Sequence, residues 1–596
     1  MTSSPDDTPP ALASMWRLCK LGYSHEPGLL VFALVMSLVA AVPDALLALL
    51  LKILADGVVD GDRRRVLLAA AGMAAAVTLT WLLRVVASRV TRRFRDKVTI
   101  VLESHVAELQ ASISTIEHHE RRDFLDRLAV LRTQVFVLDH MYMSLFSTCG
   151  WIVRLGLTAA LLMSIHPALA LLMLFALPTV ATSSWRPAVE RAAEERAASH
   201  NRLAAHLFAT ATGAAPGKEV RVTGIGPQLV HRRREEWERW YVAVSAARWT
   251  SAVWHALAWT VFGLGFVGAV VFVAAGIHGS AGDVILALAA GGRLSAYVAA
   301  TMAEIGFLRG IWLDGSRRLA WLEDYASALT ERADQRPPDS LSTGISLVDV
   351  SFAYPGTDTL ALDEVSLDLP AGTVVAVVGE NGAGKSTLVK LLCKMYEPTS
   401  GQVLVDGQPL STIASDAWRT KVSGAFQDFF RFELAARSSV GVGDLPAVDD
   451  DAAVQHAVGK AGADDVVERL ESGLDTQLGP TWPDGVDLSF GQWQKLALAR
   501  GFMREDPLLL ILDEPTAALD AETEHELFSR YSNAARAGTN GGITLLVSHR
   551  FSTVRMADLI VVLQGAEVVQ FGNHDDLMRS GGAYAELYSI QAAAYH

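Results

Sequence analysis

Six apolar stretches, each about as long as one crossing of a lipid bilayer, constrain the fold of this chain more than any other feature. A helix needs roughly 20 mostly apolar residues to cross the hydrocarbon core. Hydrophobic residues make up 51% of the 596 residues, while charged residues make up only 19%. We therefore predict an all-α membrane domain with six spans, at Pro27–Leu51, Val66–Val86, Ser144–Ile165, Ala168–Trp185, Ala252–Gly276 and Ala281–Phe307.

The second and fourth gaps between these spans are long and highly charged, whereas the third and fifth gaps are short. Long loops without structure are uncommon, so we expect spans two to five to continue as helices beyond the membrane. The long gaps carry "RVTRRFRDK" and "HRRREEWERW". Because basic segments stay in the cytosol, this side is predicted to be cytosolic. Arg63, Arg64 and Arg65 would then lie outside, against the rule, but the long gaps hold many more basic residues.

Shifts in composition divide the chain into four parts. Residues 1–12 are polar, acidic and Pro-rich, which predicts a disordered tail, and residues 13–330 hold the six spans. Residues 331–344, "ERADQRPPDSLSTG", are typical of a linker. From 345 to 596, short β-branched runs alternate with helical segments, which predicts an α/β domain with a largely parallel core sheet. The net charge of −14 argues against nucleic acid as a partner.

The first chemical motif of the predicted α/β domain is a phosphate-binding loop. Gly379–Ser386 fits the pattern G-x-x-x-x-G-K-[ST], with an apolar strand before it and a helical segment after it. Its glycines let successive backbone N–H groups curl around phosphates, Lys385 can reach the β and γ oxygens, and Ser386 can ligate Mg²⁺. ATP and Mg²⁺ are therefore the expected cofactors, bound by Gly379, Glu380, Asn381, Gly382, Ala383, Gly384, Lys385, Ser386 and Thr387.

Two further apolar strands end in groups that can act on a phosphate. "LLLILDEP" ends in Asp513 and Glu514. Asp513 suits coordination of Mg²⁺, and Glu514, which we expect on the opposite face of the strand, could deprotonate the attacking water. "TLLVSHR" places His549 at a strand end, which favours contact with the γ-phosphate over the structural role that a lone histidine more often has.

With these motifs in this order, the chain resembles an ATP-binding cassette (ABC) transporter of the exporter type, with a membrane domain and a P-loop nucleotide-binding domain fused in one half-transporter. "KEVRVTG" and "GVDLSFGQWQKLALARG" are similar to segments of bacterial exporters of peptides and secondary metabolites. The resemblance implies that Tyr354 stacks on adenine and that Gln427 touches Mg²⁺ and senses the membrane domain. It also makes Asp520 the D-loop residue and His549 the switch histidine.

The same resemblance makes "LSFGQ" (Leu488–Gln492) the family's signature, which faces the P-loop of a second nucleotide-binding domain. Six spans and one cassette are half of the usual complement, so we expect a homodimer or a pairing with a paralogous half-transporter. Phe490 stands where the family usually has Gly, and we do not expect it to disable the site. The residues expected to act in trans are Ser489, Phe490, Gly491 and Gln492.

Two segments near the midpoints of the long gaps interrupt the helical pattern. Ser114–Leu128 and Gly213–Gly226 resemble in position the coupling helices of exporters. An aromatic cluster follows Gln427 and could form the groove that receives such a helix, or it could pack inside its own domain; its members are Phe429, Phe430 and Phe432.

The resemblance implies export of a peptide or an amphipathic small molecule, driven by ATP hydrolysis and alternating access, across the cytoplasmic membrane of a bacterium with the cassette in the cytosol. Alternatives on the same scaffold are a flippase for a lipid or lipid-linked glycan, an importer of metal chelates, or an ATP-gated sensor. Besides a second half-transporter, the expected partners are the transported substrate and membrane lipid. Charged and polar residues inside the spans are candidates for lining the cargo cavity. They are Asp44, Arg154, His255 and Arg293, with pairing between Asp44 and Arg154 as the competing interpretation.

Overall fold

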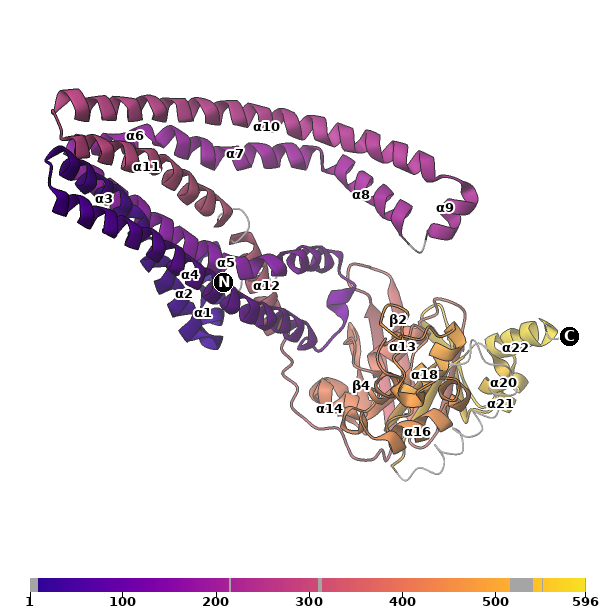
Figure 1. Cartoon of the computed structure of the whole chain (residues 1–596). Coiled ribbons are helices and arrows are strands. Elements are labelled where there is room, and N and C mark those ends of the chain that lie inside the picture. Colours follow the sequence, from indigo (N-terminus) through magenta and orange to yellow (C-terminus); the bar gives the residue numbers. More distant parts are fainter. Residues whose placement is uncertain (1–8, 214–215, 309–312, 515–539, 549, 595–596) are drawn as a thin grey trace. The chain divides into compact units, whose positions relative to one another are not determined.

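The computed structural model describes residues 9–213, 216–308, 313–514, 540–548 and 550–594, and the chain divides into two compact units. The first unit comprises Met1–Gln110 and Arg127–Tyr325 and is helical throughout its described part. The second comprises Ala111–Asp126 and Ala326–His596 and is built mainly of strands and short helices (Figure 1).

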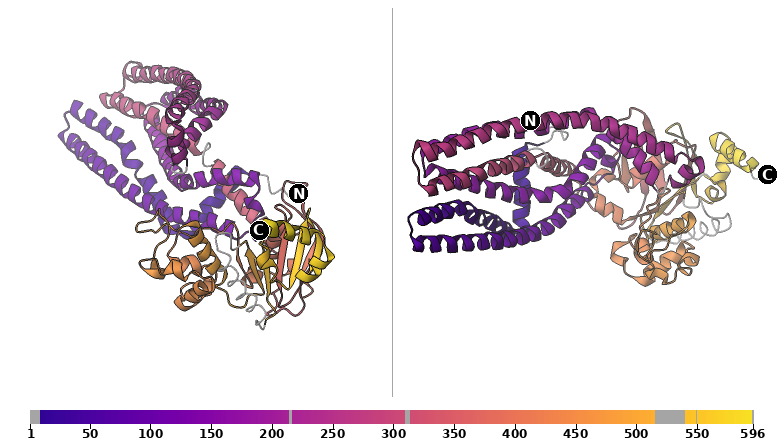
Figure 2. Two further views of the ribbon diagram at one scale, coloured as in Figure 1. Left: turned by 90° about the vertical axis from the view of Figure 1, so that its right-hand side faces the viewer. Right: turned by 45° about the horizontal axis from the view of Figure 1, so that its top comes forward.

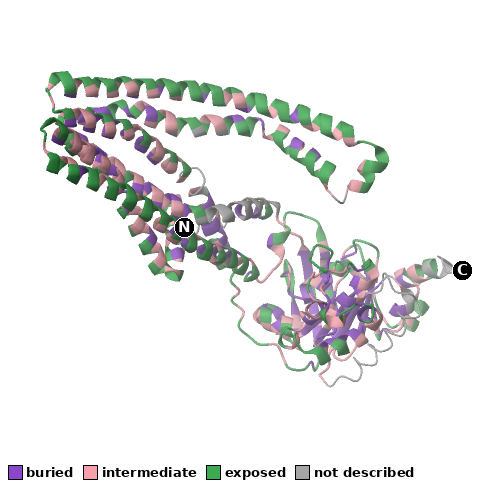
Figure 3. Cartoon of the chain, viewed as in Figure 1, coloured by how far each residue is buried: buried purple, intermediate pink, exposed green. Residues whose placement is uncertain are grey.

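Six helical segments of the described residues are long and apolar enough to cross a membrane, as predicted. The chain is therefore a multi-pass membrane protein. Apolar side chains such as Leu67, Leu68 and Trp81 are exposed on these helices, which is what lipid-facing helices require. Figure 3 shows exposed residues along much of the length of the long helices. The six segments are Pro27–Val59, Arg63–Ala111, His140–Met163, Pro167–Arg196, Gly226–Gly276 and Ala281–Phe307.

Long helices carry the first unit well past the thickness of a bilayer. The 49-residue α4 would measure about 70 Å at 1.5 Å per residue, against about 30 Å for the hydrocarbon core. α10 runs beside α7 and α8, and α11 runs beside α3 (Figures 1 and 2). The helices are α1 (Ala11–His25), α2 (Pro27–Val39), α3 (Val42–Val59), α4 (Arg63–Ala111), α5 (Arg122–Met163), α6 (Leu172–Phe175), α7 (Leu177–Arg196), α8 (Ala198–Thr212), α9 (Gly217–Thr223), α10 (Gly226–Val271), α11 (Ala281–Phe307) and α12 (Leu313–Ala328).

The first span differs from the single stretch that its hydropathy predicts. It is broken at Ala40 and Ala41 into α2 and α3, because Pro43 lacks a backbone N–H and fits only the first turn of a helix. It also continues past Leu51 to Val59. Lys52 can follow the apolar run because its ammonium lies 2.5 Å from the Asp283 carboxylate of α11.

Two sheets form the frame of the second unit. The first is antiparallel, in the order β2-β1-β4-β5, and the second has the order β10-β9-β3-β8-β7-β6 and is parallel except for β10. The strands are β1 (Gly344–Ala353), β2 (Leu360–Pro370), β3 (Val374–Gly379), β4 (Ser400–Val405), β5 (Gln408–Pro409), β6 (Val422–Ala425), β7 (Leu509–Asp513), β8 (Ile543–Val547), β9 (Leu559–Gln564) and β10 (Glu567–Gly572).

Short helices complete the second unit and enclose its cores. β3, "VVAVVG", is buried at its first five positions, as expected for a parallel strand covered on both faces. Because β3, β8 and β7 are neighbours and parallel, their carboxyl ends meet at one edge, which positions the site. The helices are α13 (Lys385–Leu392), α14 (Ser415–Thr420), α15 (Ala436–Gly441), α16 (Asp451–Lys460), α17 (Asp464–Val467), α18 (Phe490–Gly501), α20 (Phe551–Val554), α21 (His574–Ser580) and α22 (Ala583–Ala594).

Part of the segment expected to be a linker lies along the second unit instead of hanging free. Gln335 donates its N–H to the carbonyl of Thr412 at 3.2 Å and accepts from the N–H of Ala414 at 2.9 Å. Glu331 accepts from the N–H of Ser415 at 2.9 Å. Near the N-terminus, α1 begins at Ala11, although the composition predicts a disordered tail up to residue 12.

Candidate nucleotide site

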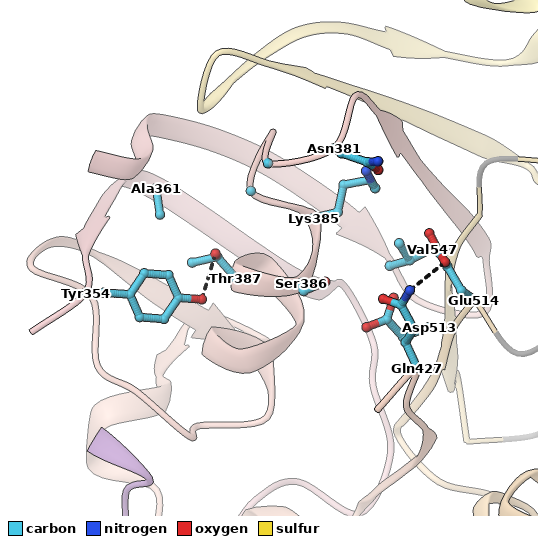
Figure 4. A pocket seen from close by; sticks show the side chains of 12 residues that line it. Tyr354, Ala361, Asn381, Lys385, Ser386, Thr387, Gln427, Asp513, Glu514 and Val547 are labelled. Carbon is cyan, nitrogen blue, oxygen red and sulfur yellow. Dashed lines mark hydrogen bonds between the residues drawn. The ribbon is translucent and has the colours of Figure 1, made fainter. Parts of the chain in front are cut away.

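A cavity of about 630 Å³ opens at the carboxyl ends of the parallel strands (Figure 4). It brings together residues from the loop between β3 and α13, from α13, from the end of β7 and from the segment after β6, as the motifs predict. Ala361 and Val547 also line it, although the sequence analysis gave neither residue a role. The lining residues are Tyr354, Ala361, Asn381, Gly382, Gly384, Lys385, Ser386, Thr387, Gln427, Asp513, Glu514 and Val547.

The phosphate-binding loop joins β3 to α13 through backbone conformations that suit glycine. Gly384 has φ +99°, and a Cβ there would lie 2.5 Å from the carbonyl oxygen of Ala361, so no other residue fits. Lys385 follows at the start of α13, and its ammonium donates to the carbonyls of Gly379 at 2.8 Å and Glu380 at 2.9 Å. Burial lowers the pKa of this ammonium. The loop's own carbonyls thus hold the cation at the wall of the cavity.

Asp513 ends β7 and is 5% exposed. Burial, with a like charge on Glu514 and on Asp428, raises the pKa of its carboxyl to about 6. Its Oδ1 is buried and has no hydrogen-bond partner among the described residues. An unpaired buried carboxylate oxygen beside the Ser386 hydroxyl is a hard-oxygen donor set that fits Mg²⁺.

Glu514 does not lie on the opposite face of the strand, contrary to the expectation from alternation. β7 ends at Asp513, and Glu514 has φ +45°, a left-handed conformation that turns the chain. Its N–H still donates to the carbonyl of Val547 at 3.0 Å, and its Oε2 accepts from Nε2 of Gln427 at 2.9 Å. Both carboxylates therefore line the same cavity (Figure 4). Alternation applies only within a strand, and this residue is outside it.

Tyr354 forms the far wall of the cavity (Figure 4). Its hydroxyl lies 3.0 Å from Oγ1 of Thr387, and its ring meets the rings of Phe352 and Tyr396 edge to face, with centroids 5.0 and 5.6 Å away. The ring is thus held at a fixed angle by two neighbouring aromatic residues.

The signature segment forms the start of α18. The Oγ of Ser489 accepts from the N–H of Gln492 at 3.3 Å, and Oε1 of Gln492 accepts from the N–H of Ser489 at 2.9 Å, which is a capping box. Phe490 is 54% exposed, and its ring centroid lies 5.5 Å from that of Phe429. Within the described part of the chain, the residues that line the cavity include none from this segment.

The aromatic cluster after Gln427 is divided between core and surface. Phe429 packs against the helical core that includes α16 and α18, whereas Phe430 is 70% exposed. Phe432 stacks with the guanidinium of Arg500 at 4.5 Å from its ring centroid. Internal packing therefore holds for Phe429 and not for Phe430, and the groove stays a prediction. Asp520 and His549 lie outside the described residues, as do residues 214 and 215 of the second coupling segment.

The first coupling segment contributes residues 111–126 to the second unit. Its contacts there with Met395 and Arg419 lie outside the aromatic cluster. Ile116 donates its N–H to the carbonyl of Met395 at 3.1 Å, just beyond the end of α13. Arg419 donates to the carbonyl of Ser114. This docking site was not evident in the sequence, because it is formed by backbone carbonyls and a helix end.

Three of the four candidate residues in the spans come together. Oδ2 of Asp44 lies 3.4 Å from Nε of Arg154 and accepts from the hydroxyl of Tyr297 at 3.2 Å, and Oδ1 of Asp44 lies 3.7 Å from a guanidinium nitrogen of Arg293. This is the pairing that competed with a cargo role. His255 lies apart, with one ring nitrogen 3.0 Å from Thr182 Oγ1 and the other accepting from Trp259 at 2.9 Å.

Comparison with known proteins agrees with this geometry. Residues 362–517 match the family model described as ABC transporter. The chain is 36% identical over 244 residues to the nisin transport ATP-binding protein NisT of Lactococcus lactis, and 39% identical over 256 residues to the ATP-dependent lipid A-core flippase of Burkholderia orbicola. These alignments cover 41% and 43% of the chain but only 40% and 41% of the two relatives.

A solved structure extends the comparison to the whole fold. The structure of a bacterial Atm1-family ABC exporter with ATP bound superposes with a TM-score of 0.74 at 24% identity, and it covers 96% of this chain and 99% of that protein. The likeness at this identity concerns the fold alone. Residues 362–517 thus match the ABC transporter family model, and the chain, whose described part has six helices long and apolar enough to cross a membrane, has the fold of a solved ABC exporter.

Proposed function

We propose that this chain is one half of a dimeric exporter that hydrolyses ATP and moves a peptide or an amphipathic small molecule out of the cell. The observation that carries the proposal is the cavity in which Lys385, Asp513 and the hydrogen-bonded pair of Gln427 and Glu514 face one another. Transfer of a phosphoryl group to water needs a cation, a carboxylate that can bind a metal ion and a second carboxylate that is held in a fixed orientation, and Lys385, Asp513 and Glu514 are groups of these kinds.

In this proposal each group has a separate task. Lys385 exchanges the loop carbonyls for the phosphate oxygens of ATP, and Tyr354 carries the adenine. Glu514 takes the proton of the attacking water, with its carboxylate oriented by Gln427 at 2.9 Å. Ser386, Asp513 and Gln427 would hold Mg²⁺, which neutralises charge on the phosphates when bound. His549 would complete the site at the γ-phosphate.

The position of the signature supports dimerisation. Ser489, Gly491 and the N-terminus of α18 present a helix start that can cap a phosphate, yet they do not line the described cavity. We infer that they cap the ATP held by a second copy of the chain, or by a paralogous half-transporter, with Asp520 at the same interface. Closing the two cassettes on ATP and releasing them by hydrolysis would drive alternating access of the spans, in the cytoplasmic membrane with the cassettes in the cytosol.

A lipid flippase is the second candidate. The relatives include both a nisin transport protein and a lipid A-core flippase at nearly equal identity, so both cargo classes are supported to the same degree. Stimulation of ATPase activity in lipid nanodiscs by peptides, lipids or small amphipathic molecules separates the two. A rise confined to lipids would replace export by flipping.

Glu514→Gln tests the hydrolytic proposal. We expect this variant to bind ATP as the wild type does and to lose turnover by a factor on the order of 10² or more, because the base is removed while the hydrogen-bonding shape stays. Glu505→Gln, at an exposed position before β7, is the matched control and should turn over normally. Wild-type turnover in Glu514→Gln would refute the assignment of the base.

A further inference from the structure

Lys390 connects the adenine wall of the cavity with the first coupling segment. It lies on α13, which begins at Lys385 in the phosphate-binding loop. Its Nζ lies 4.9 Å from the ring centroid of Tyr354 and 3.2 Å from Oε1 of Glu120. A second aromatic ring, that of Tyr396, lies 5.6 Å from the same ammonium. One cation therefore contacts both the ring expected to carry the base and a carboxylate of the coupling segment.

The segment that holds Glu120 is fixed to the end of the same helix. Glu120 follows the single 3₁₀ turn Glu117–His119. Four residues before Glu120, the N–H of Ile116 donates to the carbonyl of Met395 at 3.1 Å. The guanidinium of Arg419 donates to the carbonyl of Ser114 and also, at 2.7 Å, to the carbonyl of Lys394. Backbone contacts thus hold Glu120 within reach of Lys390, so the ion pair does not depend on a flexible loop.

The charge on Lys390 is maintained by these neighbours. Burial by itself lowers the pKa of the ammonium, but Tyr354 and Glu120 more than offset that effect and raise the pKa above its ordinary value. The side chains of Lys390 and Glu120 are 29% and 37% exposed, so neither is immobilised by packing alone. A base stacked on Tyr354 restricts the motion of the ring that Lys390 covers. The Lys390 ammonium also contacts Glu120, so Glu120 becomes more ordered as well.

We propose that Lys390 and Glu120 are positioning residues that couple occupancy of the Tyr354 ring by a nucleobase to the order of the first coupling segment. The inference rests on the proposed function, because it requires that the cavity binds ATP with its base on Tyr354. It goes beyond that function in naming a link on the base side, separate from the phosphate side at Gln427. The link is reciprocal: whatever loosens Glu120 weakens binding of the base.

Binding of ATP and of inorganic tripolyphosphate, which has no base, tests the link on the full-length chain. We expect Lys390→Met and Glu120→Gln each to weaken ATP binding about threefold, the usual size of an exposed cation–π contact, and to leave tripolyphosphate binding unchanged. The double variant should bind ATP no more weakly than Lys390→Met alone. Lys421→Met removes a comparable ion pair, 3.2 Å from Asp339, and should bind both ligands as the wild type does.

Several outcomes of this binding experiment would overturn the link. They are equal losses for both ligands, additive losses in the double variant, or wild-type affinity of Glu120→Gln for ATP. If the wild-type chain bound neither ligand, the proposed function itself would fall. Binding of ATP by the wild type with no effect of either variant would remove only the link.

Hydrogen exchange gives a second measurement, made first on the wild-type chain and then on Lys390→Met. ATP should slow exchange of the backbone amides of residues 112–120 more than tripolyphosphate does at equal saturation, and Lys390→Met should erase the difference. Equal slowing by both ligands in the wild type would contradict the proposal, because it would place all of the coupling on the phosphate side.

Discussion

Replacing Glu331 by glutamine should loosen the segment that enters the cassette, because it leaves a buried ammonium without its counter-charge. The Lys394 side chain is only 5% exposed, and its Nζ lies 2.5 Å from Oε1 of Glu331. Among the described residues, Nζ also donates to the carbonyl of Ile413. Glu331 also accepts from the N–H and the hydroxyl of Ser415, at 2.9 and 2.7 Å.

The magnitude follows from burial. Removing one partner of a buried ion pair costs about 3–5 kcal/mol. Glutamine keeps one amide oxygen near Nζ and Ser415, so we expect the lower end, about 3 kcal/mol. At about 1.4 kcal/mol for each tenfold change, the local opening constant should rise on the order of 100-fold.

Native-state hydrogen exchange at Ala414 and Gln335 measures that opening, since both amides bond across the segment. Glu331→Gln combined with Lys394→Met should recover most of the protection, because no unpaired charge remains. Asp339→Asn breaks only an exposed pair and should change protection less than about twofold. The reasoning would be refuted if the local opening constant rose less than threefold in Glu331→Gln, or if the double variant opened more than the single variant.

Three further changes have definite expected results. Burial raises the pKa of Asp406, but hydrogen bonds from the amides of residues 342–344 outweigh burial, so the pKa in the folded chain lies below its ordinary value. The Asp406 carboxylate therefore stabilises the fold fully above pH about 4, and this stabilisation is lost as the pH falls further. The melting temperature of the wild type should thus fall more steeply between pH 5 and 3 than that of Asp406→Asn. Phe490→Gly should keep ATPase activity within about twofold, since Gly at a helix start costs at most about 1 kcal/mol; a large gain would show that the wild-type site is attenuated. Asp44→Asn should lower the melting temperature in detergent by leaving arginines unpaired, and adding Arg154→Leu should restore part of it.

The spans and the phosphate-binding loop could be predicted because their signals are local. Hydropathy over about 20 residues is enough to locate a span, and Gly384 needs only its own backbone and the nearby Ala361 carbonyl to be irreplaceable. The pairing of Asp44 with Arg154 was also within reach, because an isolated charge in a span needs a partner and few are available.

Other features depend on contacts that no local pattern contains. Lys390 and Glu120 are 270 residues apart in sequence, and each alone is an ordinary surface charge. The break after Val39 depends on whether Pro43 falls in a first turn, which hydropathy does not register. The direction of Glu514 depends on one positive φ angle at the end of β7, a conformation that its residue type does not favour.

Gln427 illustrates how the two kinds of information combine. The resemblance assigned it to Mg²⁺, whereas its Nε2 donates to Glu514 at 2.9 Å. These roles are compatible because an amide has a donor and an acceptor at opposite corners, so its Oε1 stays free to face a cation beside Asp513. A carboxylate at this position could face the cation but would repel Glu514. In the proposed mechanism the amide is therefore the group that can orient Glu514 and face Mg²⁺ at once, and any movement of the segment after β6 would displace both contacts together.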